Sequence, residues 1–171
     1  MGTWFKGFVL GVAALLGLSK AGEPPAMSLR AYRDTTSIYA SFELENLPDT
    51  DLARLVDSSF IVRIQATVWA GSAHTEAYRD IRHDGLGYEV RVSETGGVHR
   101  TLDSKAAWTI ASRFNKIALG PVTAQRFPMA LGCKVQLSLP SDPDYDPMVI
   151  WGYKPAAAYR ELDSVGLVPY Y

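Results

Sequence analysis

The sequence predicts a mainly β domain of the α+β class: an antiparallel, sandwich-like β-meander with one longer helix packed across the sheet and one short helix. Three observations support this prediction. Apolar and polar residues alternate in several short segments, turn signals containing glycine, aspartate or proline separate these segments, and only two stretches space their apolar residues as a helix does.

The alternation is clearest in residues 37–44 and 61–69. Each places every second residue, all apolar, on one face, as expected for a strand that is buried on one side. Trp69 falls on the opposite, less buried face of the second strand. Residues 28–33 precede the first strand across a three-residue turn, and we expect the two to form a hairpin.

Further hairpins are predicted downstream. Residues 77–82 and 87–93 flank His83-Asp84-Gly85, and an Asp-Gly pair favours the positive φ angles of a tight turn. In the second of these strands Tyr88, Val90 and Val92 are expected to face inward. A Gly-Gly turn then suggests that residues 98–102 pair back, and residues 134–139 form the last predicted strand before Pro140.

Two segments are predicted to be helical. The short helix begins at the acidic N-cap cluster Asp49-Thr50-Asp51 and ends near Ser58. The longer helix begins at Asp103 or Ser104 and ends near Asn115. Its apolar stripe indicates that it covers one face of the sheet, and consists of Ala107, Ile110, Ala111 and Phe114.

Residues 1–21 have the pattern of a cleavable signal peptide: Lys6, an uncharged apolar run over residues 7–18, and small residues before a cut between Ala21 and Gly22. An apolar run of this length is shorter than the roughly 20 residues that span a bilayer. We therefore expect export to the periplasm or cell envelope with no membrane span after cleavage. The alternative is an uncleaved N-terminal membrane anchor.

The remainder is divided into a β-rich domain, residues 22–140, and an aromatic, proline-rich C-terminal arm, residues 141–171, expected to pack on the domain. The chain carries 17 Lys+Arg and 18 Asp+Glu. Because two of the lysines, Lys6 and Lys20, lie in the signal, the rest has a net charge of −3. This balance argues against a nucleic-acid partner, which would require clustered basic residues.

Neither the cysteine nor the histidines form a recognisable catalytic or metal-binding motif. Cys133 is the sole cysteine and alternates with apolar residues, so we interpret it as a small buried hydrophobe; the alternative is a reactive thiol. His74, His83 and His99 lack the spacing of metal ligands. Asp142, Asp144 and Asp146 alternate as calcium ligands can, but solvated loop acids are the preferred interpretation. We expect no catalytic residue, no metal and no cofactor.

Aromatic residues are the candidate binding residues. Tyr39, Trp69 and Tyr88 are expected on an outer sheet face, where they could form a platform for a sugar, lipid or peptide, and Trp151 and Tyr153 on the C-terminal arm could do the same. The alternative is that the helix or the arm covers these side chains and makes them a second small core.

A resemblance to a known family rests on the signal, the early hairpin, the acidic-capped helix and three segments: Ile61-Val62-Arg63-Ile64, Gly87-Tyr88-Glu89-Val90 and the run from Thr101 to Trp108. With these features the chain resembles an uncharacterised family of exported bacterial envelope proteins classed as a domain of unknown function. The resemblance covers about residues 28–140 and implies an envelope location without a known activity.

These features together predict a non-enzymatic binding or assembly module that contacts another envelope protein through a sheet edge or the C-terminal arm. The alternative is a carrier of a small apolar ligand or lipid, with its pocket between sheet and helix.

Overall fold

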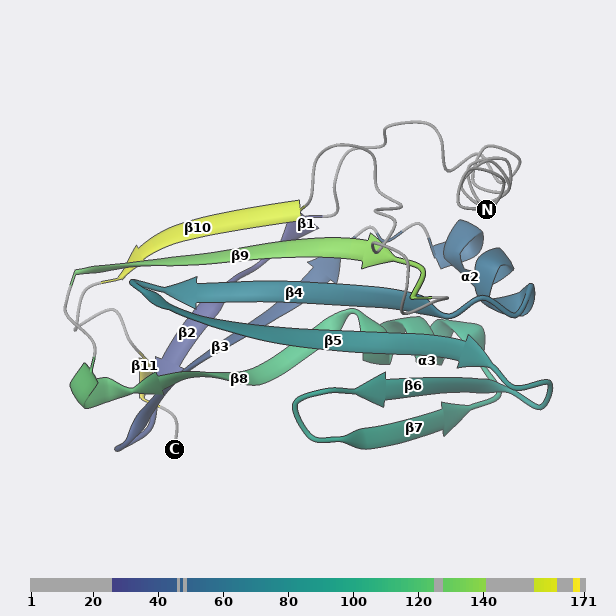
Figure 1. Cartoon of the computed structure of the whole chain (residues 1–171), viewed down its shortest axis with the longest axis horizontal. Coiled ribbons are helices and arrows are strands. Elements are labelled where there is room, and N and C mark those ends of the chain that lie inside the picture. The colour runs from purple at the N-terminus through teal and green to yellow at the C-terminus, as the bar shows by residue number, and fades with distance from the viewer. Residues whose placement is uncertain are drawn as a thin grey trace, which may run out of the picture.

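The computed structural model describes residues 26–45, 47, 49–124, 128–140, 156–162 and 168–169. Its strands form two sheets, and the two sheets and two helices enclose one hydrophobic core (Figure 1). The predicted fold class, a mainly β sandwich-like domain with two helices, is confirmed.

The larger sheet has six antiparallel strands in the order β10-β9-β4-β5-β6-β7. The strands are β4 (Val62–Ala70), β5 (Ala73–His83), β6 (Tyr88–Val92), β7 (Gly97–Thr101), β9 (Met129–Ser138) and β10 (Ala156–Leu162). In β4 buried and half-buried residues alternate along the whole strand, so one face of this sheet lies against the core and the other faces outward.

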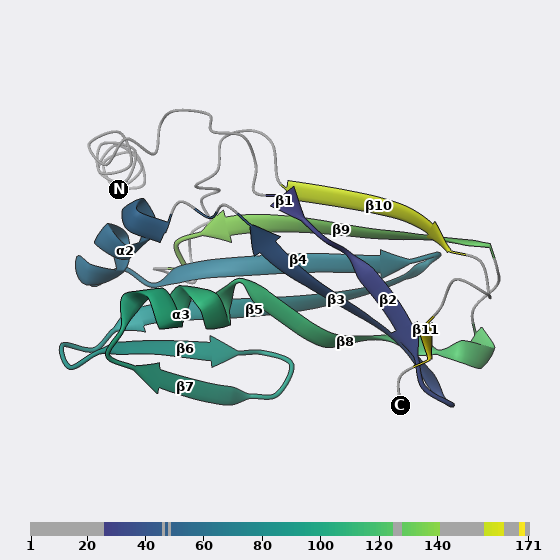
Figure 2. The same ribbon diagram turned by 180° about the vertical axis from the view of Figure 1, so that it is seen from behind.

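The smaller sheet is built around β3 (Ser37–Glu45). Its other strands are β1 (Ala26–Met27), β2 (Arg30–Arg33), β8 (Arg113–Pro121) and β11 (Val168–Pro169). β1 and β2 pair with one side of β3 and β8 with the other, while β11 runs parallel to β2. Figure 2 shows β2 and β3 crossing the larger sheet at an angle. Stacked rings of Phe42 and Phe114, with centroids 4.7 Å apart, join β3 to β8 within the core.

The helices α2 (Asp49–Asp57) and α3 (Ser104–Ala111) complete the layer formed by the smaller sheet. Figure 2 shows α3 lying over β5 and β6 beside the smaller sheet. Asp103 caps α3, since its carboxylate accepts backbone N–H bonds from Lys105 and Ala106 at 3.1 and 3.2 Å. The core-facing residues Ala107, Trp108 and Ala111 are buried, so the predicted packing of this helix on the sheet is confirmed.

A buried ion pair lies where the two layers meet. The Arg79 side chain, on β5, is 3% exposed and pairs with Glu94 in the β6–β7 turn. Its Nη2 also donates to the Arg113 carbonyl at 2.9 Å, and its guanidinium lies 4.2 Å from the centre of the Phe114 ring. This one side chain therefore joins β5 and the β6–β7 turn to β8.

The last third of the predicted longer helix, residues 112–115, was predicted wrongly. α3 ends at Ala111, so its eight residues make it about as long as α2, and the chain continues from Arg113 as β8. The reason is pairing: the Ser112 carbonyl accepts the Leu44 N–H at 3.0 Å, and Phe114 then faces Phe42 across the β3–β8 ladder. A strand was not predicted here, nor was β10, which pairs with β9 from Ala156↔Val135 onward.

Candidate functional site

The candidate site lies at one end of the larger sheet, and its first part is the β5–β6 turn. The Asp84 carboxylate accepts the N–H groups of Leu86 and Gly87, each at 3.0 Å, and Gly85 adopts a positive φ of 88°. These backbone bonds, that from Leu86 first, lower the pKa of Asp84. These bonds fix the conformation of the β5–β6 turn, in which the Leu86 side chain points into solvent and is 85% exposed.

The second part is the junction between β7 and α3. Thr101 Oγ1 accepts the Asp103 N–H at 3.1 Å, and Asp103 caps the helix. Leu102 lies between these two bonded residues and is also 85% exposed. It packs over Gly87: a Cβ built at Gly87 would lie 3.2 Å from Leu102 Cδ2 and 2.8 Å from the Thr101 carbonyl oxygen. The close approach of the two turns therefore requires glycine at this position.

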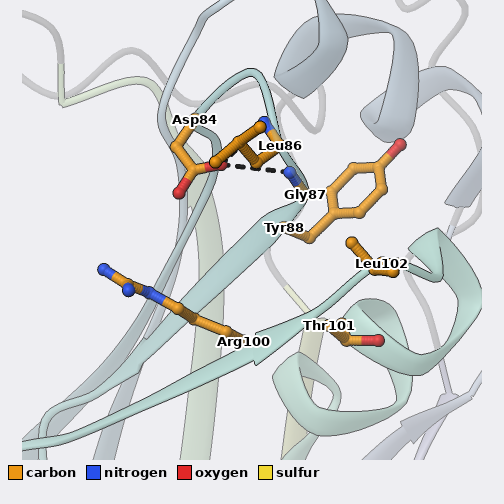
Figure 3. A pocket seen from close by; sticks show the side chains of 7 residues that line it. All are labelled: Asp84, Leu86, Gly87, Tyr88, Arg100, Thr101 and Leu102. Atoms are coloured by element: carbon orange, nitrogen blue, oxygen red, sulfur yellow. Dashed lines mark hydrogen bonds between the residues drawn. The ribbon is translucent and has the colours of Figure 1, made fainter.

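Tyr88 joins these two turns to α2. Its hydroxyl donates to Asp57 Oδ1 at 2.7 Å, and its ring meets His83 edge-on with centroids 5.0 Å apart. The bond to Asp57, followed by burial, raises the pKa of Tyr88. Figure 3 shows Leu86, Tyr88 and Leu102 grouped at this end of the hairpin.

Leu86, Tyr88 and Leu102 line a pocket of about 230 Å³. Its remaining lining comes from Asp84, Gly87, Arg100 and Thr101 (Figure 3). The Arg100 side chain is 72% exposed and bonds to Glu89 at 3.1 Å, so one guanidinium stands at the rim of an otherwise mainly apolar hollow. We call the pocket together with Leu86 and Leu102 the leucine pocket. Such a hollow suits an apolar side chain with polar groups on either side of it.

The leucine pocket continues into β7, one of the two end strands of the larger sheet. Among the described residues no strand pairs with the outer side of β7. The edge carries Val98, 48% exposed, and contains no proline; its one charged residue, Arg100, is bonded to Glu89. A row of backbone donors and acceptors thus runs directly into an exposed apolar patch.

The three described aromatic residues of the predicted platform lie on three different surfaces, and a shared platform is therefore wrong. Trp69 is on the outer face of the larger sheet, where its indole covers Gly132 of β9: a Cβ at Gly132 would lie 2.2 Å from Trp69 Cε2. Tyr88 packs against the core side of the same sheet. Tyr39 belongs to the smaller sheet, where it stacks on Tyr32 with centroids 5.6 Å apart.

Each of these aromatics also has polar partners or close neighbours. Tyr39 donates to Asp34 at 2.9 Å and lies 5.3 Å from the Lys116 ammonium. The other candidate residues, Trp151, Tyr153, Ala21 and Gly22, lie outside the described residues. Sequence reasoning missed Leu86 and Leu102; the available signal was an apolar residue directly after Asp-Gly and another directly before a helix N-cap.

The described side chains include no group of three or more His, Cys, Asp and Glu that could hold a metal ion. Cys133 is buried in β9, and burial raises its pKa from 9.0 to about 12. A thiol with this pKa stays protonated near neutral pH and is a poor nucleophile. This placement agrees with the interpretation of Cys133 as a small buried hydrophobe.

Comparisons of the chain with protein-family models, with curated protein sequences and with solved structures found no match. In the part of the chain that the structure describes, neither helix has the length and apolar character needed to cross a bilayer.

Proposed function

We propose that the chain is a non-enzymatic binding module of the periplasm or cell envelope, and that its partner is another envelope protein. An extended segment of the partner adds to β7, and an apolar side chain of that segment enters the leucine pocket. The observation that carries the proposal is the pair of leucines, each 85% exposed, at the end of an unpaired edge strand. The envelope location rests on the signal-peptide pattern of residues 1–21.

Single exposed leucines are common on protein surfaces and need no explanation. Here, however, two turns from different parts of the chain bring Leu86 and Leu102 to the same pocket, and side-chain bonds from Asp84 and Thr101 shape both turns. The presentation of these leucines is therefore built into the local structure and involves little ordering on binding. Prearranged apolar anchors lose less entropy when a partner arrives.

The binding free energy requires both the two leucines and the edge strand β7. Burying a leucine contributes about 1.5–3 kcal/mol, so the two leucines together contribute about 3–6 kcal/mol. Micromolar binding corresponds to about 8 kcal/mol. The remainder would come from strand pairing along β7, which is how extended segments gain affinity when they add to a sheet edge. We therefore expect a moderate, reversible affinity.

The alternative function, a carrier with an apolar pocket between sheet and helix, receives less support from the described residues. On the helix side Ala107, Trp108 and Ala111 are buried, and on the strand side Ile81 and Val90 are fully buried. Neither the leucine pocket nor a second pocket on the smaller sheet is lined by any of these five buried residues. We therefore favour docking at the sheet edge.

Site-specific photo-crosslinking tests the proposal in cells that make the protein. A benzophenone amino acid at Leu102 should give one discrete adduct with another protein, whereas the same group at Ser72 should not. Ser72 is an exposed residue in the turn at the opposite end of β5 and serves as the matched control.

A second substitution makes the test specific for the leucine pocket. Leu86→Asp should remove the adduct from Leu102, because it places a charge in the apolar hollow, while Ser72→Asp should leave it unchanged. Because Leu86 is 85% exposed, the free energy of unfolding of the Leu86→Asp protein should lie within about 0.5 kcal/mol of that of the parent protein. No adduct from Leu102, an adduct that survives Leu86→Asp, or the same adduct from Ser72 would contradict the proposal.

A further inference from the structure

A second pocket, of about 340 Å³, lies on the smaller sheet, on different elements from the leucine pocket. Its floor is β3, and its walls come from the segment that includes β2 on one side and from β8 on the other. The polar side chains that line it are Ser28, Arg30, Ser41, Glu43, Arg113 and Asn115. Five of the six carry a hydrogen-bond donor, and the sixth is the carboxylate of Glu43.

The strand register explains the hollow. Arg30 lies directly opposite Ser41, and Glu43 lies directly opposite Arg113. A serine between long side chains leaves open space above β3. Because neighbouring residues on one face of a sheet stand only about 5 Å apart, the two arginines can reach the same small ligand from opposite sides.

A β-bulge adds to the same surface. Between the pairs Ala40↔Ile117 and Phe42↔Phe114, two residues of β8, Asn115 and Lys116, stand opposite the single residue Ser41. Lys116 has a positive φ of 57°, and its N–H donates to Ser41 Oγ at 3.0 Å. Both bulge residues are exposed; Asn115 lines the pocket, and the Lys116 ammonium lies 5.3 Å from the centre of the Tyr39 ring. Bulges commonly redirect side chains in this way next to functional sites.

The charges in and around the pocket favour an anion. Among the residues that line it, Arg30 and Arg113 supply two positive charges against the single carboxylate of Glu43. Arg113 Nε bonds to Glu43 Oε1 at 3.0 Å, but both side chains are about half exposed, so this ion pair is weak and easily shared with a ligand. The Arg30 side chain has no ion pair or hydrogen bond with another described residue, although its backbone pairs with β3.

We propose that this pocket binds the phosphoryl group of a small phosphorylated ligand, with Arg30 and Arg113 as its principal contacts. Guanidinium groups bind phosphate oxygens through paired N–H donors, and an excess of positive charge suits a dianion better than a single carboxylate. A pocket of about 340 Å³ also has room for more than a phosphate. Tyr32, whose hydroxyl is 3.2 Å from Ser41 Oγ, stands at its end beside Tyr39, where a sugar ring or a lipid headgroup would lie.

Binding of glucose 6-phosphate, inorganic phosphate and glucose, measured by calorimetry or NMR titration, tests the proposal. We expect glucose 6-phosphate to bind more tightly than inorganic phosphate, and glucose not to bind. Arg30→Gln should weaken glucose 6-phosphate binding about tenfold, the effect of losing a hydrogen bond between charged groups. Arg91→Gln is the control, because it removes the same charge from an exposed position on the larger sheet.

Vesicles containing phosphatidic acid in phosphatidylcholine distinguish the two sources of the phosphoryl group. Binding to these vesicles that is lost in Arg30→Gln, with no binding of glucose 6-phosphate, would support the proposal with a lipid headgroup as the source. The proposal would be overturned if none of the phosphorylated probes bound, or if Arg91→Gln weakened binding as much as Arg30→Gln. Neither result bears on the leucine pocket, so this proposal and the docking proposal fail independently.

Discussion

The contact between Trp69 and Gly132 decides whether Trp69 is a structural residue or a free binding residue, and it gives a sharp prediction. Gly132→Ala adds one methyl group at a position where its carbon would lie 2.2 Å from Trp69 Cε2 and 2.3 Å from Cζ2. Real carbon atoms do not approach this closely, so the indole must leave its place on β9. Forcing a packed side chain out of its rotamer costs about 1–3 kcal/mol.

The sign of the effect should reverse when the indole is absent. In a Trp69→Ala background the added methyl meets no ring, and alanine in a strand is more favourable than glycine by about 0.5–1 kcal/mol. The two substitutions should therefore be coupled by about 2 kcal/mol, well above the few tenths expected for independent sites. Urea unfolding followed by far-ultraviolet circular dichroism measures all four proteins, because that signal does not depend on tryptophan.

Gly97→Ala serves as the control for the added methyl group. There the new carbon would meet only the end of the Thr95 side chain, 2.9 Å away, which can rotate. Its effect on the free energy of unfolding should be the same with and without Trp69. If Gly132→Ala cost the same in both backgrounds, the indole would not lie on Gly132, and Trp69 would again be a candidate binding residue.

Three further predictions concern stability. Arg79→Met should destabilise the domain by about 3–5 kcal/mol in urea unfolding, because it leaves Glu94 largely buried without its partner. Cys133 has a raised pKa of about 12 in the folded protein. Its contribution to the free energy of unfolding is therefore complete below the unfolded pKa near 9 and is lost as the pH rises toward 12. Cys133→Ala should remove this part of the loss of stability at alkaline pH. Gly87→Ala should lower stability by about 1–3 kcal/mol, because the Thr101 carbonyl must move.

Each of these has a result that would contradict it. An Arg79→Met protein within 1 kcal/mol of the parent would mean that the buried ion pair is replaceable by apolar packing, as is known for some such pairs. Alkaline destabilisation that is identical in Cys133→Ala would assign the effect to other groups. A Gly87→Ala protein of unchanged stability would show that the two turns beside the leucine pocket are not tightly packed.

Strands with one buried face could be predicted from the sequence. In β3 and β4 buried residues alternate with half-buried or exposed ones, and apolar and polar side chains alternate in the sequence with the same period of two. The Asp-Gly turn after His83 likewise specifies its hairpin locally. These features need no knowledge of the rest of the chain.

β8 could not be predicted for two physical reasons. Phe114 lies at helical spacing from Ala107 and Ala111, so it extends the apolar stripe of the preceding helix by coincidence. The bulge at Asn115 and Lys116 then breaks the alternation that would have revealed a strand. Residues 113–121 form a strand because they pair with β3, a segment that is distant in the sequence.

The candidate site depended on tertiary structure in the same way. Alternation correctly placed Tyr39 and Trp69 on outward faces, but it does not say to which sheet a strand belongs. The exposure of Leu86 and Leu102 is equally a property of the whole fold, since nothing in the local sequence brings the β5–β6 turn against the β7–α3 junction.

Hydrogen–deuterium exchange at the edge strand tests the central proposal most directly. Once photo-crosslinking has identified the partner, exchange of the backbone amides of β7, Gly97–Thr101, is compared in the free protein and in the complex. We expect the outward-facing amides of β7 to exchange quickly in the free protein and to become protected in the complex, together with those around Leu86 and Leu102. Unchanged exchange in β7, with protection elsewhere on the domain, would contradict docking at this edge.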